Sequence, residues 1–457
     1  MPLASTSLLV ACLAWTTVAF GGVYPWGYWS MLAGVVLFVG SVAMIPHLRA
    51  QLRREPLVLP FAAIIAAIGM QIVPLPHDVR ILLSPTSEPV LRAYDLSLKA
   101  GSAHALSIDP PATLVALALV TALASASVAL SAALSSGGRH RLATALMFVG
   151  LGVALIGIIQ RPFFTGRIYG FWEPATETNS FGPFVNPNHF AGWMAMMLPV
   201  VLATICGQVQ NAARRQSFRH YLVSDDPAAS KLLVAMVTAM VMGLSLVLSL
   251  SRSGVACFLL GCGATLVFIS RRQDGMRRIA AVSYIVLMTV GVVAWAGAST
   301  VAREFGLTDW SQIQGRIGAS QDAAGVAWAF PLTGTGLNTY GISMLFYQQH
   351  DLRVHYSAAH NDYVQLLAEG GLLLALPLIW ALVTLVRTVR RRLADDRHDP
   401  ESYWLRLGAV TGLAAIGIQE IVDFSLQIPA NALLFAILCA IAVHRSPSSV
   451  QRRTAAS

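Results

Sequence analysis

Apolar residues along this chain gather in long runs that short polar segments interrupt. A run of about 20 residues with almost no charge is the length of helix that crosses a ~30 Å hydrocarbon core. A helix also satisfies its own backbone hydrogen bonds there, so the pattern predicts an all-α, polytopic integral membrane protein. We expect about twelve transmembrane helices, near residues 5–23, 28–46, 57–73, 111–134, 141–160, 187–207, 231–250, 253–270, 279–297, 364–386, 405–424 and 428–444.

The polar segments divide the chain into four parts: helices one to five in 1–160, helices six to nine with an outer loop at 161–186 in 161–297, a large outer loop in 298–363, and the last three helices with a tail in 364–457. The large loop is too rich in aromatic and aliphatic residues for a disordered segment. Helical spacing recurs around 316–330 and 338–349, with a turn at Pro331 between them. We predict a helical layer on the outer membrane surface, with a cap that only shields the helices as the alternative.

Charge is scarce and unevenly distributed. Of the 457 residues 56% are apolar and only 12% charged, whereas soluble domains carry about 25% charged residues. The formal charge of +9 is also typical of nucleic-acid-binding proteins, but the basic residues concentrate in alternate loops, for example at Arg271, Arg272 and Arg390. The positive-inside rule therefore assigns those loops and both termini to the cytoplasm, and we expect no nucleic-acid partner. The first apolar run lacks a basic leader, so we expect it to be retained rather than cleaved.

Cysteine and histidine spacing gives no sign of a metal site. All five cysteines fall within predicted helices, where they act as small apolar residues. His350, His355 and His360 recur at intervals of five, whereas ligands on one helical face need spacings of three or four. We therefore predict no disulfide, no metal and no cofactor.

Charged side chains are costly near a membrane, so those at the outer helix ends are candidates for function. Arg252 lies in a short hairpin, where Ser251 or Ser253 can cap the next helix and add its positive end to the guanidinium. This combination favours a phosphate group. An arginine that reaches toward lipid headgroups is an equally good explanation of the hairpin alone.

Two helix starts carry polar side chains at the same outer surface. Asn186 followed by Pro187 is a strong helix-start signal, and the adjoining Asn188 and His189 either face a substrate or tie the cap to the preceding loop.

The second helix start follows the large loop. Asn361 or Asp362 can cap this helix, which places His360 at its exposed positive end. The helix dipole then disfavours the charged imidazolium, and a neutral imidazole suits general-base work. Tyr363 follows, and Glu369 lies about two turns into the helix, where it can hold an arginine or line a polar cavity.

The order of the motifs resembles that of the O-antigen ligase family, which includes Wzy-type polymerases and protein O-oligosaccharyltransferases. The motifs are Asn186-Pro187-Asn188-His189-Phe190-Ala191-Gly192, Ser251-Arg252-Ser253-Gly254, Gly315-Arg316, Pro331-Leu332-Thr333-Gly334-Thr335-Gly336, His360-Asn361-Asp362-Tyr363, Glu369-Gly370-Gly371 and Val422-Asp423-Phe424. The resemblance covers roughly residues 160–435.

The resemblance implies a metal-independent glycosyltransferase of the bacterial inner membrane with its active site in the periplasm. The donor is then a glycan on undecaprenyl pyrophosphate, and the acceptor is the lipid A core or a growing polysaccharide. Matched residue by residue, Arg252 and Arg316 correspond to the family's two arginines and His360 to its histidine. The candidates for substrate binding are the polar residues at the two helix starts and within the second helix: Asn188, His189, Asn361, Asp362, Tyr363 and Glu369.

Three other functions remain open from the sequence. A polymerase would use the same donor. A lipid or solute transporter would place its ionisable groups near the membrane midplane, whereas the polar candidates of this chain cluster at the outer face. The length and composition of the large loop also fit a non-catalytic scaffold.

Overall fold

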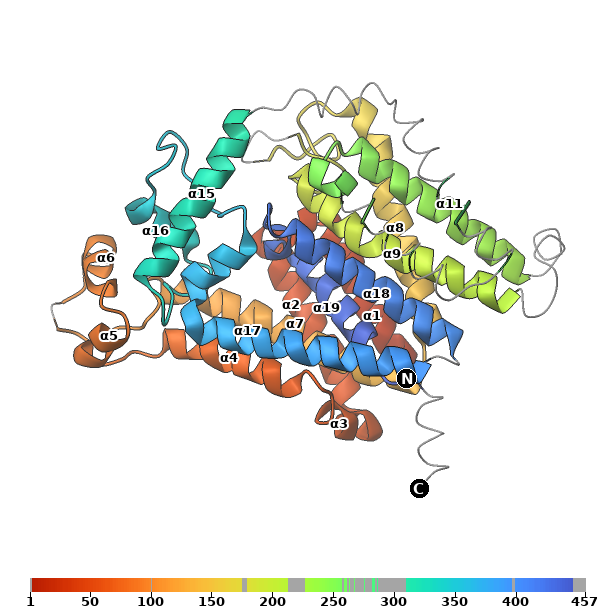
Figure 1. The fold of residues 1–457 in the computed structure, drawn as a ribbon, viewed down its shortest axis with the longest axis horizontal. Coiled ribbons are helices and arrows are strands. Elements are labelled where there is room, and N and C mark those ends of the chain that lie inside the picture. The colour runs from red at the N-terminus through yellow and green to blue at the C-terminus, as the bar shows by residue number, and fades with distance from the viewer. Residues whose placement is uncertain are drawn as a thin grey trace.

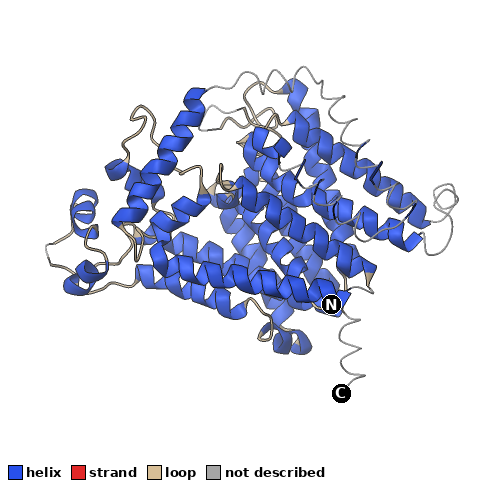
Figure 2. Ribbon diagram, in the orientation of Figure 1, coloured by secondary structure: helices blue, strands red, loops and turns tan. Residues whose placement is uncertain are grey.

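The computed structural model describes residues 2–99, 101–174, 179–212, 227–256, 310–396 and 399–446, with isolated positions between 257 and 309. These described parts of the chain are helical and contain no β-strand, which confirms the predicted all-α class (Figure 2). The helices are α1 (Pro2–Val18), α2 (Pro25–Ala43), α3 (Pro46–Leu52), α4 (Val58–Ile72), α5 (His77–Leu83), α6 (Ser87–Tyr94), α7 (Pro110–Ser136), α8 (Arg139–Gln160), α9 (Pro187–Ala212), α11 (Pro227–Leu248), α15 (Trp310–Ala329), α16 (Tyr340–Tyr347), α17 (Asp362–Asp395), α18 (Pro400–Gln419) and α19 (Pro429–Val443).

Six helices of the described chain are long and apolar enough to cross a membrane, namely α2, α7, α8, α9, α11 and α17. The apolar helices α1, α4 and α19 are shorter. Large apolar side chains on the outside of the helices are strongly exposed, with Val36 and Leu37 at 64% and Leu382 at 59%. Such a surface suits contact with lipid rather than water, so the fold indicates a membrane protein. The predicted helices at 253–270 and 279–297 lie largely outside the described residues.

Two of the helix ends that differ from those predicted bear on the site and on the basic residues. The helix predicted over 405–424 is α18, which ends at Gln419, so Glu420 and Asp423 lie in the following loop and not in the helix. The helix predicted over 364–386 is α17, which continues to Asp395. Its added turns carry the basic residues that the hydrophobic pattern assigned to a loop, because straight-chain arginines are good helix formers.

Helices α9 and α18 pack together at the centre of the molecule. Their backbones approach so closely that a Cβ atom on Gly408 would lie 2.7 Å from the carbonyl oxygen of Pro199. One turn later, a Cβ atom on Gly412 would lie 2.5 Å from the carbonyl oxygen of Met196. Small residues one turn apart allow this approach, as in many membrane helix pairs. The contact fixes the start of α9 beside the end of α18.

The region predicted as the large outer loop contains α15 and α16, which confirms helices at both predicted positions. Figure 1 shows them beside the long helices, toward the end of the molecule where α5 and α6 also lie. The turn between them inserts at a break in α17, where Gly371 has φ of 53°. The amides of Leu372 and Leu373 donate to the carbonyls of Pro331 and Leu332 (both 2.9 Å). The break in α17 therefore docks α15 and α16 against the long helices.

Candidate functional site

Segments far apart in the sequence meet at one end of α18. They are the start of α9, the hairpin after α11, the first half of α15, the loop before α17 and the loop between α18 and α19. Each carries at least one of the motifs found in the sequence.

The hairpin after α11 is tied to the start of α9. The Ser251 hydroxyl donates to Asn188 Oδ1 (2.7 Å) and accepts from the Gly254 amide (3.2 Å), so Ser251 is the predicted capping serine. A Cβ atom on Gly254 would lie 2.4 Å from Cβ of Ala191, which only glycine permits. Arg252 follows Ser251 directly and is partly exposed. Its backbone therefore lies beside Asn188.

The start of α9 is held from two sides. Asn186 Oδ1 accepts from the Asn188 amide (2.9 Å), which confirms the predicted N-cap ahead of Pro187. The carbonyl of Asn188 accepts from Gln419 Nε2 at the end of α18 (3.0 Å). The carbonyl of His189 accepts from Asn431 Nδ2 of α19 (3.0 Å). The side chain of Asn188 thus accepts a hydrogen bond from the hairpin, and its backbone carbonyl accepts one from α18.

Two imidazole rings contact one phenyl ring. The Phe424 ring centroid lies 4.8 Å from that of His189 and 5.0 Å from that of His360, both with edge-to-face geometry. His189 Nε2 also lies 3.7 Å from Asp423 Oδ1 and makes no hydrogen bond within the described residues. The loop after α18 therefore positions both histidines.

His360 occupies a strained and partly buried position. Its φ of 52° is in the left-handed region, which costs a non-glycine residue about 1–3 kcal/mol. Its Nδ1 atom is buried and has no hydrogen-bond partner in the described part of the chain. Burial, followed by the charge of Arg316, lowers the pKa of His360 to about 4. The imidazole is therefore neutral as predicted, but burial is the main cause and not the exposed helix end.

Arg316 brings positive charge to the two histidines. It lies on α15 and is partly exposed, and it forms no ion pair with any described residue. Its charge reaches His189, His360 and Asp423. The neighbouring Gly315 allows this placement, since a Cβ atom there would lie 2.3 Å from the Tyr356 hydroxyl. The loop before α17 can therefore pack against α15 at Arg316.

The first turn of α17 holds the loop after α18. Asn361 is the N-cap, and its Oδ1 accepts from the Val364 amide (3.2 Å). The Asp362 amide donates to the carbonyl of Glu420 (3.0 Å), and Asp362 Oδ1 accepts from Gln427 Nε2 (2.7 Å). Asp362 is 8% exposed and Glu420 2% exposed. Both residues thus fix the loop that carries Phe424.

Glu369 and Tyr363 lie apart from this group and have protein partners. The Glu369 carboxylate accepts from the amides of Asn338 (3.0 Å) and Tyr340 (2.8 Å), so it holds the turn before α16. The Tyr363 hydroxyl donates to the carbonyl of Gly417 (2.6 Å), and the side chain is 50% exposed. These contacts give both side chains a structural role, and the substrate binding that the sequence suggested for both stays a prediction.

The sequence did not indicate three residues of the site, namely Phe424, Gln419 and Gln427. None carries charge, and their partners are more than 60 residues away except for neighbours in the same loop. The one signal was the Val422-Asp423-Phe424 motif of the resemblance. In the described part of the chain, no group of three or more His, Cys, Asp or Glu residues is arranged to hold a metal ion.

The arrangement can bind an anion beside a neutral proton acceptor. Arg316 acts electrostatically on His360, and Arg252 lies in the hairpin whose Ser251 binds Asn188. Nδ1 of His360 has no hydrogen-bond partner among the described residues. Guanidinium groups pair with phosphate oxygens in planar geometry. A neutral imidazole accepts a proton from a hydroxyl. Transfer from a phosphate-linked donor to a hydroxyl acceptor needs both functions.

Comparison with known proteins gives an independent answer for the middle segments of this arrangement. No curated protein sequence matches the chain. Residues 237–379 match the family model described as O-antigen ligase, a segment that includes Arg252, Arg316 and His360. The start of α9 and the loop after α18 lie outside the match. The predicted resemblance is confirmed, and over residues 237–379 the chain has the signature of the O-antigen ligase family, whose members are membrane enzymes that transfer glycans.

Proposed function

We propose that this protein transfers a glycan from undecaprenyl pyrophosphate to a sugar hydroxyl at the periplasmic face of the bacterial inner membrane, without a metal ion. The product is O-antigen ligated to the lipid A core. One observation carries the proposal: a neutral, strained His360 lies within the electrostatic reach of Arg316. The alternate distribution of basic loops supports the periplasmic placement of this end.

The reaction is a single displacement at the anomeric carbon. The imidazole of His360 accepts the proton of the acceptor hydroxyl while the hydroxyl oxygen forms a bond to the anomeric carbon. The bond from that carbon to the pyrophosphate oxygen breaks, and the pyrophosphate leaves with the electron pair. Arg252 and Arg316 stabilise its developing charge. Attack opposite the leaving group inverts the anomeric configuration.

The low proton affinity of His360 suits this sequence of events. In the free enzyme Arg316 opposes protonation of the imidazole. A bound pyrophosphate brings negative charge to the same place, which favours the imidazolium. The imidazole of His360 therefore gains proton affinity only when the donor is bound. Proton uptake is then limited to complexes that contain the donor.

Reconstitution tests the proposal. Purified protein in liposomes is supplied with undecaprenyl-pyrophosphate-linked glycan and lipid A core, with and without a chelator, and the products are sized. We expect single additions to the core that persist with chelator. A ladder on the lipid carrier would instead indicate a polymerase, and carrier movement across the membrane without a new glycosidic bond would indicate a transporter.

His360→Ala supplies the residue-level test. General-base catalysis contributes about 10²–10⁴-fold in rate, so we expect a loss of that order in kcat with normal insertion and yield. His355→Ala is the matched control, because His355 is an exposed histidine of the same loop and we expect it to retain full activity. Wild-type transfer by a correctly inserted His360→Ala protein would refute the role of His360.

A further inference from the structure

The buried arginines of the described chain differ in whether they have an anionic partner. Three are buried, namely Arg80, Arg392 and Arg406. Arg80 is ion-paired with Glu88, and Arg406 with Asp396. Arg392 is 6% exposed and forms no ion pair with any described residue, and its Nε atom is buried there without a hydrogen-bond partner. A buried cation without a partner carries a large desolvation cost, so we expect an anion beside Arg392.

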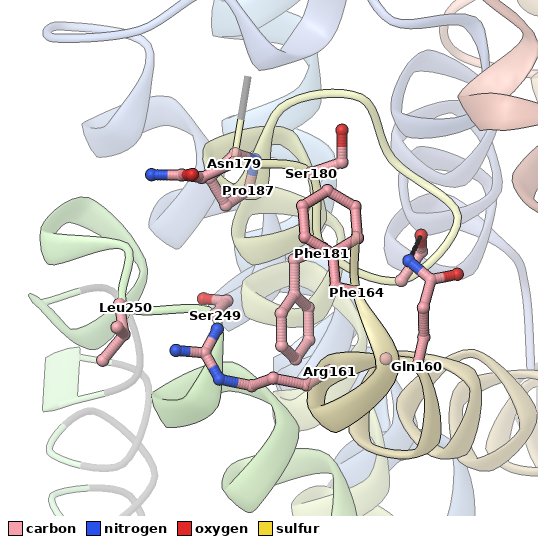
Figure 3. Close-up of a pocket in the computed structure, with 11 residues that line it drawn as sticks. Gln160, Arg161, Phe164, Asn179, Ser180, Phe181, Pro187, Ser249 and Leu250 are labelled. Atoms are coloured by element: carbon pink, nitrogen blue, oxygen red, sulfur yellow. Dashed lines mark hydrogen bonds between the residues drawn. The ribbon is translucent and has the colours of Figure 1, made fainter. Parts of the chain in front are cut away.

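Arg161 shows that a guanidinium can also be accommodated without an acid. It lines a pocket between the end of α8 and the start of α9, and its guanidinium carbon lies 5.7 Å from the centroid of the Phe181 ring (Figure 3). A cation over an aromatic face is attracted by the ring quadrupole. The described residues provide no such ring for Arg392. The charge of Arg392 therefore lacks both of these compensations.

Arg392 lies where the ends of several helices converge. The chain leaves α19 through Arg445, whose amide donates to the Ser135 hydroxyl at the end of α7 (2.9 Å). One turn earlier on α7, the Ser131 hydroxyl donates to Glu55 Oε2 in the loop before α4 (2.7 Å). The charges of Arg445 and Glu55 both reach Arg392 on α17. The end of α7 thus fixes both neighbours of this buried guanidinium.

Glu55 does not neutralise this group of side chains. Three further guanidinium charges act on Arg392 against the carboxylate of Glu55, and they belong to Arg445, Arg391 and Arg406. Burial raises the pKa of the Glu55 carboxyl in spite of a hydroxyl hydrogen bond and nearby arginines, which favours the neutral acid. Among the described residues, Glu55 Oε1 and Arg445 Nε are also buried without hydrogen-bond partners. The group therefore keeps excess positive charge and unused donors.

The exposed surface of α17 changes from apolar to basic just before Arg392. Leu382 and Val386 are exposed, and so are Arg387 and Arg390. Leu382, Val386 and Arg390 follow one another at four-residue spacing, so they share one stripe of the helix. Exposed apolar side chains suit acyl chains, and arginines at a helix end suit headgroups. Arg392 therefore lies at the level of the lipid headgroups.

Helix α4 provides a second apolar surface at this level. Gln71, near its end, donates to the carbonyl of Glu369 in the first part of α17 (2.8 Å), and the two helices lie side by side (Figure 1). The start of α4 consequently lies toward the basic end of α17, and Leu59 is exposed there. Acyl chains can pack on the exposed apolar side chains of both helices while a headgroup reaches the arginines.

We propose that Arg392 and Arg445 bind the phosphate of an anionic phospholipid, at the end of the molecule that the basic loops predict to be cytoplasmic. Guanidinium groups bind phosphate oxygens in planar geometry, and basic pockets between membrane helices bind lipid headgroups. Arg445 is half-buried, so a phosphate can reach it from the surface. A free phosphate offers the same oxygens but covers none of the apolar surface beside them. The inference is independent of the proposed glycan transfer.

Thermal unfolding of the full-length protein in detergent tests the site with three additives: phosphatidylglycerol, phosphatidylcholine with the same acyl chains, and inorganic phosphate. We expect the highest midpoint with phosphatidylglycerol, because a ligand of the native state stabilises it. Titration of the midpoint should show phosphatidylglycerol binding about tenfold more weakly to Arg392→Met and to Arg445→Met. Equal shifts with both lipids overturn the site. An equal shift with inorganic phosphate overturns the lipid as its ligand.

Arg392→Met also separates a ligand site from a purely structural charge. With phosphatidylcholine alone, the wild type holds an uncompensated buried cation, so Arg392→Met should unfold at a higher midpoint than the wild type. With saturating phosphatidylglycerol the order should reverse, because only the wild type then gains the lipid. If Glu55 alone holds Arg392, the variant unfolds at a lower midpoint in both lipids, and that result overturns the proposal.

Arg387→Met is the matched control. Arg387 is an exposed arginine of the same helix, one turn before Arg392, so the variant loses the same charge at the surface. We expect a clearly smaller weakening of phosphatidylglycerol binding, because an exposed and solvated charge contributes less than a buried one. A loss as large as that of Arg392→Met would show that the lipid responds to overall charge, which overturns a specific site.

Discussion

Two arginines at opposite ends of α18 show how differently the same side chain is used. Arg406, near its start, is fully buried and donates to Asp396 Oδ2 through Nη2 (2.7 Å) and Nε (3.0 Å). It also donates to the carbonyls of Ala442 and His444, the last of these at 3.0 Å. Arg316, near the other end, is partly exposed and forms no ion pair with described residues.

The difference separates a structural charge from one available to a ligand. The carbonyls that Arg406 binds are at the end of α19, where a helix leaves them unpaired, so this arginine joins α17, α18 and α19 at one point. Arg316 instead lowers the pKa of His360 and lies within electrostatic reach of the His189 ring. Arg406 should therefore control stability, and Arg316 should control the chemistry of the site.

Removing Arg406 should have the largest effect on stability. Arg406→Leu leaves Asp396 buried without its cation, which typically costs about 3–5 kcal/mol. The measurement is the unfolding midpoint of the purified protein in detergent. The double variant Arg406→Leu with Asp396→Leu should recover much of the loss, because a buried ion pair replaced by apolar residues is often neutral. Equal stability of the single variant and the wild type would show that Arg406 does not stabilise the fold.

Glu369→Ala should have a smaller effect, and it separates the two possible roles of this carboxylate. Its loss leaves the amides of Asn338 and Tyr340 without acceptors, at a cost of about 1–3 kcal/mol for an unsatisfied buried group. We expect a lower unfolding midpoint and lower kcat, because the turn positions α15. Glu173→Ala, at an exposed glutamate, is the control. A raised KM with unchanged stability would instead indicate that Glu369 binds substrate.

The smallest effect concerns pH. Since the folded-state pKa of His360 is about 4 and its usual value is 6.5, the unfolded chain takes up the proton first. Stability should therefore fall as pH drops from about 6.5 toward 4, and kcat/KM, which reports the free enzyme, should stay level near neutrality and fall on acidification. Arg316→Gln removes one cause of the lowered pKa, so the acid limb of kcat/KM should move to higher pH. An unshifted limb would show that Arg316 does not act on His360.

The sequence predicted well those features that depend on local signals. Apolar runs located the long described helices but not the short α3, α5 and α6. The Asn186, Ser251 and Asn361 caps appear as hydrogen bonds to their own helices. Such caps act within four residues, so one stretch of sequence contains both partners. The boundary of α18 was placed five residues too late because Ile421, Val422 and Phe424 continue the apolar run beyond the helix.

Long-range arrangement was harder to predict. The contact of Phe424 with His189 and His360 depends on the close approach of α9 and α18, for which Gly408 and Gly412 gave no distinctive signal in a glycine-rich chain. Likewise Glu369 looked functional because it is an ionisable group in an apolar helix. Its partners are backbone amides about 30 residues upstream, and amides have no signature in a sequence.

The break at Gly371 bears on how the chain is assembled. An uninterrupted helix can enter a bilayer alone, because all its backbone groups are paired within it. The amides of Leu372 and Leu373 find their acceptors only in the turn at Pro331 and Leu332, which is synthesised earlier. That turn can therefore complete these hydrogen bonds only after α17 has been made. We infer that α15, and with it Arg316, reaches its final position only then.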